Sequence, residues 1–278
     1  MSDLFQTPSL IDRAAQRQTL LQSLASIFSY RELVRNLVLK DLKVKYRGSV
    51  LGFLWSLANP LAMVTIYTLA FKYILAIRQP GLPFFILLGV LAWTFFANSA
   101  VMSTSALIEG GSLVKAVRFP RAVLPLTTVL FNLVQYLLTA VVFLPLIFLF
   151  HRMPSLGPLL LFPIFLALQV ACIAGIALVL AAATTYFRDV RHFVEVALPL
   201  LFWTTPIVYP LSQAPERLRP LLLASPMSSF VVAYQQIFYY GTSPPLSVWA
   251  AGLGYGLGVF ALGTMWFLSV EDRLGEQL

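Results

Sequence analysis

Charged residues are scarce in this chain of 278 residues, and their scarcity excludes a soluble globular domain. Asp, Glu, Lys and Arg together make up 11% of the sequence, whereas hydrophobic residues make up 59%. Soluble domains carry roughly 25% charged and about 45–50% apolar residues. The composition therefore predicts an integral membrane protein.

Cysteine and histidine are nearly absent, which excludes most metal and disulfide chemistry. The chain has one cysteine, Cys172, and two histidines, His151 and His192. A single cysteine excludes an intrachain disulfide. The two histidines are expected on opposite sides of the membrane, so they cannot share a metal ion within one chain. We therefore expect no metal site and no bound cofactor.

The chain also lacks the residues for enzymatic catalysis and for binding nucleotide phosphates. No G-x-x-x-x-G-K-[ST] loop occurs, and only 11 acidic residues are present. Clustered catalytic carboxylates are thus not expected, and the chain is predicted not to be an enzyme. Any energy for driven work must come from another subunit.

Long uncharged runs dominate the rest of the chain and predict its membrane spans. The last run is too long for one crossing and is interrupted by prolines and glycines, so we divide it into a non-spanning piece and a final span, about 246–270. An all-α membrane protein with six transmembrane helices results. The runs are 48–71, 79–108, 122–150, 153–187, 196–215 and 220–270.

The basic residues orient these spans. The net charge of +8 could suggest nucleic acid, but Lys and Arg concentrate beside spans, which the positive-inside rule explains better. In a six-span topology both chain ends lie on one side of the membrane, and most Lys and Arg residues fall on that side. We therefore expect cytoplasmic tails at 1–30 and 271–278, a six-span domain at 48–270, and no nucleic-acid partner.

An amphipathic segment, 31–47, precedes the first span. Its polar side chains recur at helical spacing on one face, and apolar side chains occupy the opposite face. Such a helix favours the membrane interface, with cations among lipid headgroups. The polar stripe is Glu32, Asn36, Lys40, Lys43 and Arg47, and the apolar face includes Leu33, Val34, Leu37, Val38 and Val44.

Two further segments on the predicted cytoplasmic side carry charge. The loop 109–125 holds Lys115, Arg118 and Arg121 between a Gly-Gly pair and a proline. It is either a topogenic basic turn or a short helix that contacts a partner. At the start of the fifth span, Glu195 is expected to pair with Arg191 one helical turn earlier.

Aromatic residues, 14% of the chain, cluster near the predicted span ends. An interfacial aromatic belt would explain most of them. The alternative is a conduit with aromatic walls, because sugars stack their C–H faces on such rings and can slide along them. The candidate wall residues are Trp55, Tyr67, Tyr73, Trp203 and Tyr209.

Three separated motifs resemble the permeases of polysaccharide-exporting ATP-binding-cassette (ABC) transporters, which export O-antigen, teichoic acid or capsular chains. The segments LVKAVRFPRAVLP (113–125) and YFRDVRHFVEVALPLLFWTTPIVYP (186–210) match later parts of that family, and the order of the motifs matches over about 31–270. The first motif, Y-[RK]-x-S-x-L-G-x-L-W-x-x-x-x-P, comprises Tyr46, Arg47, Ser49, Leu51, Gly52, Leu54, Trp55 and Pro60.

The resemblance implies a homodimer in the bacterial inner membrane, with two separate ATPase subunits that bind ATP and Mg. Lipid-linked polysaccharide, O-antigen above all, would pass between the protomers. Re-entrant extracytoplasmic helices are implied at 211–245. The lipid headgroup would approach Lys40, Lys43, Lys45 and Arg47, and the ATPase would contact Lys115, Arg118, Phe119, Pro120 and Arg121.

Other functions remain possible on the sequence. Related ABC permeases export small hydrophobic compounds. A membrane-embedded transferase or phosphatase acting on polyprenyl lipids would need clustered titratable residues at one membrane face, which the few acids disfavour. A channel would need charged rings or a filter-like segment, and neither is evident.

Overall fold

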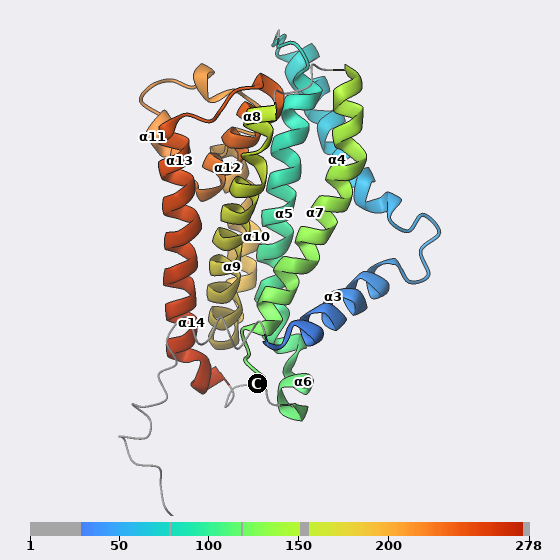
Figure 1. Ribbon diagram of the computed structural model, residues 1–278, viewed down its shortest axis with the longest axis vertical. Coiled ribbons are helices and arrows are strands. Elements are labelled where there is room, and N and C mark those ends of the chain that lie inside the picture. The colour runs from blue at the N-terminus through green and yellow to red at the C-terminus, as the bar shows by residue number, and fades with distance from the viewer. Residues whose placement is uncertain (1–28, 78, 118, 151–155, 275–278) are drawn as a thin grey trace, which may run out of the picture.

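The computed structural model describes residues 29–77, 79–117, 119–150 and 156–274, which form one bundle of helices (Figure 1). No β-strand occurs within these ranges. Helices satisfy every backbone N–H and C=O within the segment, which a hydrocarbon environment demands. The predicted all-α membrane fold is therefore confirmed.

Five helical stretches are long and apolar enough to cross a membrane, judged by length and composition. Three of them join two or three helical segments end to end, with short π-helical turns in two cases. They are α4 (Leu54–Thr68) with η1 (Leu69–Ile74), α5 (Leu82–Glu109), α7 (Val123–Phe150), α8 (Leu156–Leu159) with α9 (Phe162–Tyr186), and α13 (Leu246–Leu253) with η4 (Gly254–Val259) and α14 (Phe260–Leu274).

The helix in the fifth predicted span is short. α10 (Val190–Thr204) has 15 residues and ends where Thr205 takes up extended backbone. Pro206 explains this end, because a proline disfavours helical backbone in the residue before it and has no N–H to donate. The prolines of this run therefore shorten the helix, and the count of six spans stays a prediction.

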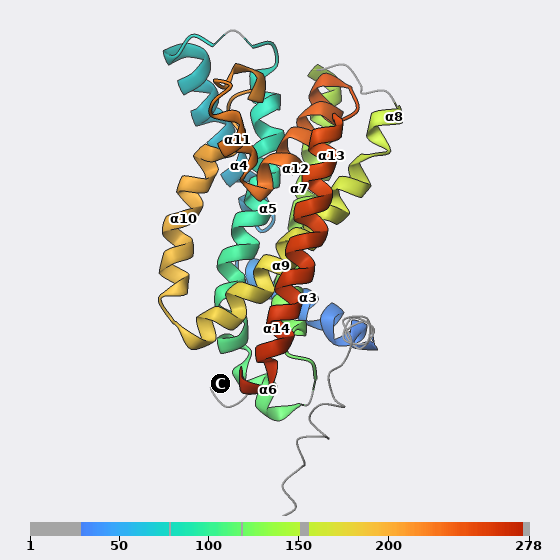
Figure 2. The same cartoon turned by 90° about the vertical axis from the view of Figure 1, so that its left-hand side faces the viewer.

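The segment 211–245 folds into helices that are too short to span. α12 is the longest at 9 residues, all but its first residue are buried, and it packs against α5, α9 and α13 near one end of the bundle (Figure 2). The location of this segment relative to the membrane stays a prediction. Its helices are η2 (Leu211–Gln213), α11 (Arg219–Leu223), α12 (Pro226–Tyr234) and η3 (Gln235–Tyr240).

The core lies around α5 and α9. α5 packs against α4, α7, α9, α10 and α12, and 78% of its most apolar stretch is buried. α9 in turn packs closely against η4 and α14. A Cβ added at Gly175 would overlap the backbone of Val259, and one added at Gly263 would overlap the backbone of Gly175. Small residues allow such close approach of helices in membranes.

A buried amide inside this core is hydrogen-bonded to two other helices. Gln169 on α9 accepts a hydrogen bond from the Tyr234 hydroxyl at 2.6 Å and donates one to the Ala92 carbonyl at 3.1 Å. It thereby joins α9, α12 and α5. Cys172, on the same helix, is fully buried and is the chain's one cysteine.

Two shorter helices lie at the opposite end of the bundle from α12. α3 (Arg31–Tyr46) runs obliquely to the long helices and packs on α7, and α6 (Gly111–Ala116) follows the end of α5 (Figure 1). After α3 the chain swings away from the bundle before α4 begins. α3 and α6 therefore share one end, where the sequence predicts the cytoplasm.

Candidate functional site

The basic residues of α3 divide into two groups. Lys40, Lys43 and Arg47 line an open hollow of about 470 Å³ on the outer face of the helix. The Lys40 ammonium lies 3.9 Å from the Asp41 carboxylate. Burial raises the pKa of Asp41 despite this lysine, and nearby Glu109 raises it further. The outer face thus offers several cations to an anionic ligand.

Lys45 points elsewhere, so the structure separates it from the three other cations predicted to contact a headgroup. Its ammonium lies 5.5 Å from the centre of the Phe131 ring on α7 and 5.9 Å from the Tyr46 ring. Desolvation by this packing lowers the pKa of Lys45. Helical spacing places position 45 away from the stripe of 40, 43 and 47, which explains the division.

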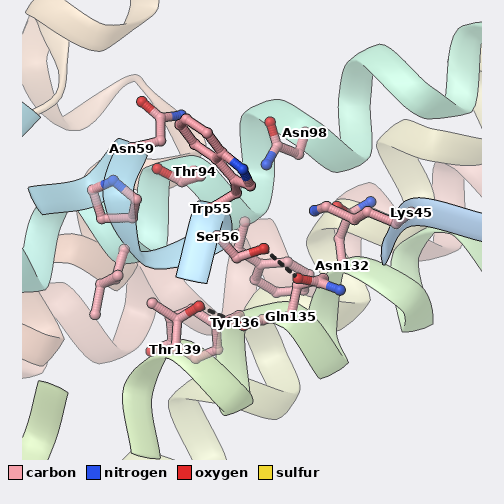
Figure 3. A pocket seen from close by; sticks show the side chains of 13 residues that line it. Lys45, Trp55, Ser56, Asn59, Thr94, Asn98, Asn132, Gln135, Tyr136 and Thr139 are labelled. Atoms are coloured by element: carbon pink, nitrogen blue, oxygen red, sulfur yellow. Dashed lines mark hydrogen bonds between the residues drawn. The ribbon is translucent and has the colours of Figure 1, made fainter. Parts of the chain in front are cut away.

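A pocket of about 170 Å³ lies inward of α3, where α3, α4, α5 and α7 meet (Figure 3). At its base the Tyr46 hydroxyl donates to Gln135 Oε1 at 2.6 Å, and the Ser56 hydroxyl donates to the same atom at 3.1 Å. Most of its lining residues have polar side chains, and of these the sequence analysis singled out Lys45 alone. They include Lys45, Ser56, Asn59, Thr94, Asn98, Asn132, Gln135 and Thr139.

A recognisable signal for this pocket was present in the sequence. Four of the side-chain amides inside the first three uncharged runs line the pocket: Asn59, Asn98, Asn132 and Gln135. Uncharged polar residues do not interrupt a hydropathy pattern as charges do, so the runs still predicted spans. Only the folded chain brings the amides from three different spans to one place.

Three of the five aromatic residues predicted for the wall lie together. Tyr67 on α4 stacks on Phe202 with ring centres 5.4 Å apart, and its ring lies 6.3 Å from that of Trp203 on α10. The Tyr209 hydroxyl donates to the Trp203 carbonyl at 2.9 Å. Trp203 is half exposed. In this α4–α10 aromatic cluster (Tyr67, Phe202, Trp203 and Tyr209), Phe202 is buried, Tyr67 and Tyr209 are partly exposed, and Trp203 is the most exposed ring.

The other two predicted wall residues lie apart from this cluster. Trp55 lines the polar pocket beside Asn59 and Asn98 (Figure 3). Tyr73 is exposed on η1, with the Lys72 ammonium 5.4 Å from its ring centre. The five residues therefore do not form one continuous wall within a single protomer.

The loop 109–125 contains the short helix α6. Gly110 comes directly before this helix, and Gly111 is its first residue. Lys115 is exposed at the last turn of α6. Phe119 packs on a small apolar cluster that includes Leu107 and Phe267. Arg118 lies outside the described residues. The exposed end of α6 is free to contact a second protein.

Arg121 is held by the last helix instead. Its backbone N–H donates to Glu271 Oε1 at 2.8 Å, and its guanidinium donates to the Glu271 carbonyl oxygen and, at 3.5 Å, to that of Asp272. The loop and the end of α14 are thereby joined, although the residues lie far apart in the sequence. Sequence reasoning missed Glu271, one of the few acids near a span end.

The ion pair predicted at the start of α10 is confirmed. Arg191 Nε lies 3.1 Å from Glu195 Oε1, and His192 Nδ1 lies 3.4 Å from Glu195 Oε2. Because all three side chains are exposed, the pair contributes little to stability. Within the described ranges, no group of three His, Cys, Asp or Glu residues could hold a metal ion.

Comparisons with known proteins bear on this geometry. Residues 32–239, from the first turn of α3 into η3, match a family described as ABC-2 type transporter. The chain is 36% identical over 237 residues to the O-antigen export system permease protein RfbA of Myxococcus xanthus, covering 84% of this chain and 91% of that protein. Two proteins of the same name from Klebsiella pneumoniae are 34% and 33% identical over 73% of this chain and 78% of each relative.

Proposed function

This chain belongs to the ABC-2 type transporter family, and on that premise we propose that it is the permease subunit that exports lipid-linked polysaccharide across the bacterial inner membrane. Membership makes it the membrane component of an ABC transporter, which acts with an ATPase partner. We propose O-antigen as the polysaccharide. The observation that carries this proposal is the identity of 33–36% to three O-antigen export permeases across most of the chain.

The proposed transporter is a homodimer with two ATPase subunits on the cytoplasmic face, and the proposed topology has both chain ends on that face. ATP and Mg bind to the ATPase subunits, and this chain holds neither. The exposed Lys115 end of α6 supports contact with an ATPase. Arg121 would transmit this contact rather than make it, because it is bonded to the end of α14.

The outer face of α3 is the proposed place where the anionic diphosphate of the lipid-linked substrate first binds. Lys40, Lys43 and Arg47 line one hollow there, and phosphate attracts clustered cations. The polymer would then move along the α4–α10 aromatic cluster, whose ring faces bind sugars without fixing them in place. Anchoring of α3 to anionic lipid is the competing explanation for its charges.

Charge reversal on α3 separates these two explanations. Lys43→Glu with Arg47→Glu should abolish export, while Arg35→Glu, an exposed change on the same helix outside the hollow, should leave export unchanged. Surface polysaccharide and membrane insertion are measured for each variant. Equal loss in both variants would identify a general anchoring role, and full export by the double variant would overturn substrate contact.

A second candidate function is export of teichoic acid, capsular polysaccharide or a small hydrophobic compound by the same architecture. The deciding experiment deletes the chromosomal copy, restores this chain together with its partner ATPase, and measures polymer at the cell surface. Surface O-antigen should disappear and return. Failure to co-purify any ATPase, or unchanged surface polymer on deletion, would overturn the proposal.

A further inference from the structure

The polar pocket between α3, α4, α5 and α7 has a lining that a hydrocarbon environment does not favour. Asn59 belongs to α4, Asn98 lies within α5, and Gln135 belongs to α7, three of the helices long and apolar enough to cross a membrane. Amides placed in hydrocarbon without partners cost roughly 2–7 kcal/mol each by transfer measurements. Polar side chains inside membrane spans are therefore functional candidates.

Several of these amides have unused hydrogen-bonding groups. Gln135 is 7% exposed, and its Nε2 has no hydrogen-bond partner among the described residues. Asn59 and Asn98 are exposed, and within the described ranges neither side chain makes a hydrogen bond. The amides of Asn59 and Asn98 and the Nε2 of Gln135, from three helices, thus converge on one small space without bonding one another.

The chemistry of the lining defines the ligand class. Each amide offers both donors and acceptors, which matches hydroxyl groups that also do both. Trp55 is 62% exposed beside Asn59 and Asn98, so its indole is available to stack on the C–H face of a sugar ring (Figure 3). No carboxylate lines the pocket, and Lys45 gives it one cation.

The size of the pocket limits the ligand further. Its volume of about 170 Å³ is below the ~300–1,000 Å³ of pockets that enclose drug-sized molecules. One ring-sized group fits, and a longer chain would have to leave through the open side. Lys45 and Trp55, which both line the pocket, flank the connection between α3 and α4.

We propose that this pocket binds the sugar ring closest to the lipid in a lipid-linked polysaccharide. The ring stacks on Trp55, Asn59 and Asn98 bond its hydroxyls, and Lys45 lies toward the phosphate that joins sugar to lipid. This inference rests on the proposed export function and adds a recognition site to it. The permease thereby distinguishes a loaded lipid carrier from an empty one before transport.

A second protein surface is a less suitable occupant. Lysine is depleted in the buried centre of protein interfaces, whereas Lys45 lies within this pocket. Lipid tails are also unsuitable, because they cannot bond the free amides. A hydroxyl-rich ligand with an adjacent negative charge satisfies the amides and the ammonium together.

The test uses the complete transporter, with its ATPase, in nanodiscs. The Asn59→Leu/Asn98→Leu double variant removes hydrogen bonds that the protein itself does not use, so the fold should persist. Trp55→Ala removes the stacking ring, and Trp266→Ala, on α14 and outside the pocket, is the matched control. ATPase stimulation is titrated with polyprenyl diphosphate linked to N-acetylglucosamine, to galactose or to glucose, and with polyprenyl diphosphate alone.

The proposal predicts a change in the concentration of the best sugar-linked lipid that gives half-maximal ATPase stimulation. This concentration should rise about tenfold in the Asn59→Leu/Asn98→Leu variant, which loses two hydrogen bonds, and in the Trp55→Ala variant, which loses one ring contact. Stimulation by polyprenyl diphosphate alone should not change, and Trp266→Ala should behave as wild type. Equal shifts for both kinds of lipid, or no shift, would overturn the sugar site.

Two further results separate this proposal from its alternatives. Dissociation of the Asn59→Leu/Asn98→Leu dimer on size-exclusion chromatography would show that a second copy covers the pocket, and would overturn the proposal. Failure of the proposed export function would be recognised independently, because the wild-type chain would then restore no surface polysaccharide. Wild-type export with unshifted variants would reject only the pocket.

Discussion

α4 and α5 are both apolar enough to cross a membrane, yet they differ in what covers them. In α5, 78% of the most apolar stretch is buried inside the protomer, whereas in α4 and η1 the corresponding share is 17%. α5 is surrounded by α4, α7, α9, α10 and α12. Hydropathy thus identifies a span but not its neighbours.

The exposed helix α4 carries several of the candidate functional residues, to which α5 adds Asn98. Trp55 and Asn59 on α4 line the polar pocket, and Tyr67 joins the aromatic cluster with α10. α5 supplies the rigid support behind them, with Phe85, Ile86 and Val90 fully buried. Substitutions in the two regions should therefore have opposite profiles: loss of folding in the core, and loss of transport or assembly on α4.

The largest loss of protomer stability is expected where α9 and α14 touch. Gly175→Ala places a methyl group against backbone that cannot move independently, and should lower the free energy of unfolding by about 3 kcal/mol. Gly258→Ala, on the same packed stretch but with open space around it, is the control and should be neutral or stabilising. Thermal unfolding in detergent measures both, and equal melting temperatures would contradict this account of the core.

The next largest effect is expected at the buried amide of α9. Gln169→Leu leaves the Tyr234 hydroxyl buried without an acceptor and should cost roughly 1–3 kcal/mol. Tyr234→Phe combined with Gln169→Leu removes both polar groups and should recover part of the loss. A double-mutant cycle of unfolding free energies checks this, and strictly additive losses would mean that the hydrogen bond contributes nothing.

Substitution of Tyr67 on α4 should change protomer stability less than the core substitutions do, but should change export more. Tyr67→Ala removes a ring pair worth about 0.5–1.5 kcal/mol, and should strongly reduce surface polysaccharide. Tyr67→Phe keeps the ring and should retain export. If Tyr67→Ala exports normally at normal expression, the aromatic cluster has only a packing role.

The smallest change in protomer stability is expected on the outer side of α4. Ile66 is 62% exposed, so Ile66→Ala should alter the protomer's unfolding free energy by less than about 0.5 kcal/mol. If this face contacts a second copy, the dimer should nevertheless weaken. Chemical cross-linking yield and size-exclusion profiles measure this, and an unchanged dimer would place the interface elsewhere.

The sequence predicted the long helices well for two reasons. Each span forms its backbone hydrogen bonds within itself, and each is recognisable as a run without charged residues. The shortened α10 and the non-spanning 211–245 were also predictable, since Pro206 and its neighbouring prolines act locally. The Arg191–Glu195 pair was predictable for the same reason, because its partners are one helical turn apart.

The sequence could not predict the contacts that depend on which helix faces pack against each other. Lys45 lies against the Phe131 ring because α3 packs on α7, and Arg121 is bonded to Glu271, 150 residues further along the chain. The polar pocket assembles amides from three spans, each inconspicuous within its own run. These contacts are long-range, and no local pattern records them.

The burial of Cys172 gives this protein a practical property. Cys172 is the chain's one cysteine, and its side chain on α9 is fully buried. Water-soluble thiol reagents should therefore react very little with the unmodified protein. A cysteine introduced at Ile66 or at Lys115 would then be the single reactive position on its surface. Spin labels or fluorophores could follow movement of the chain during ATP turnover without prior removal of native thiols.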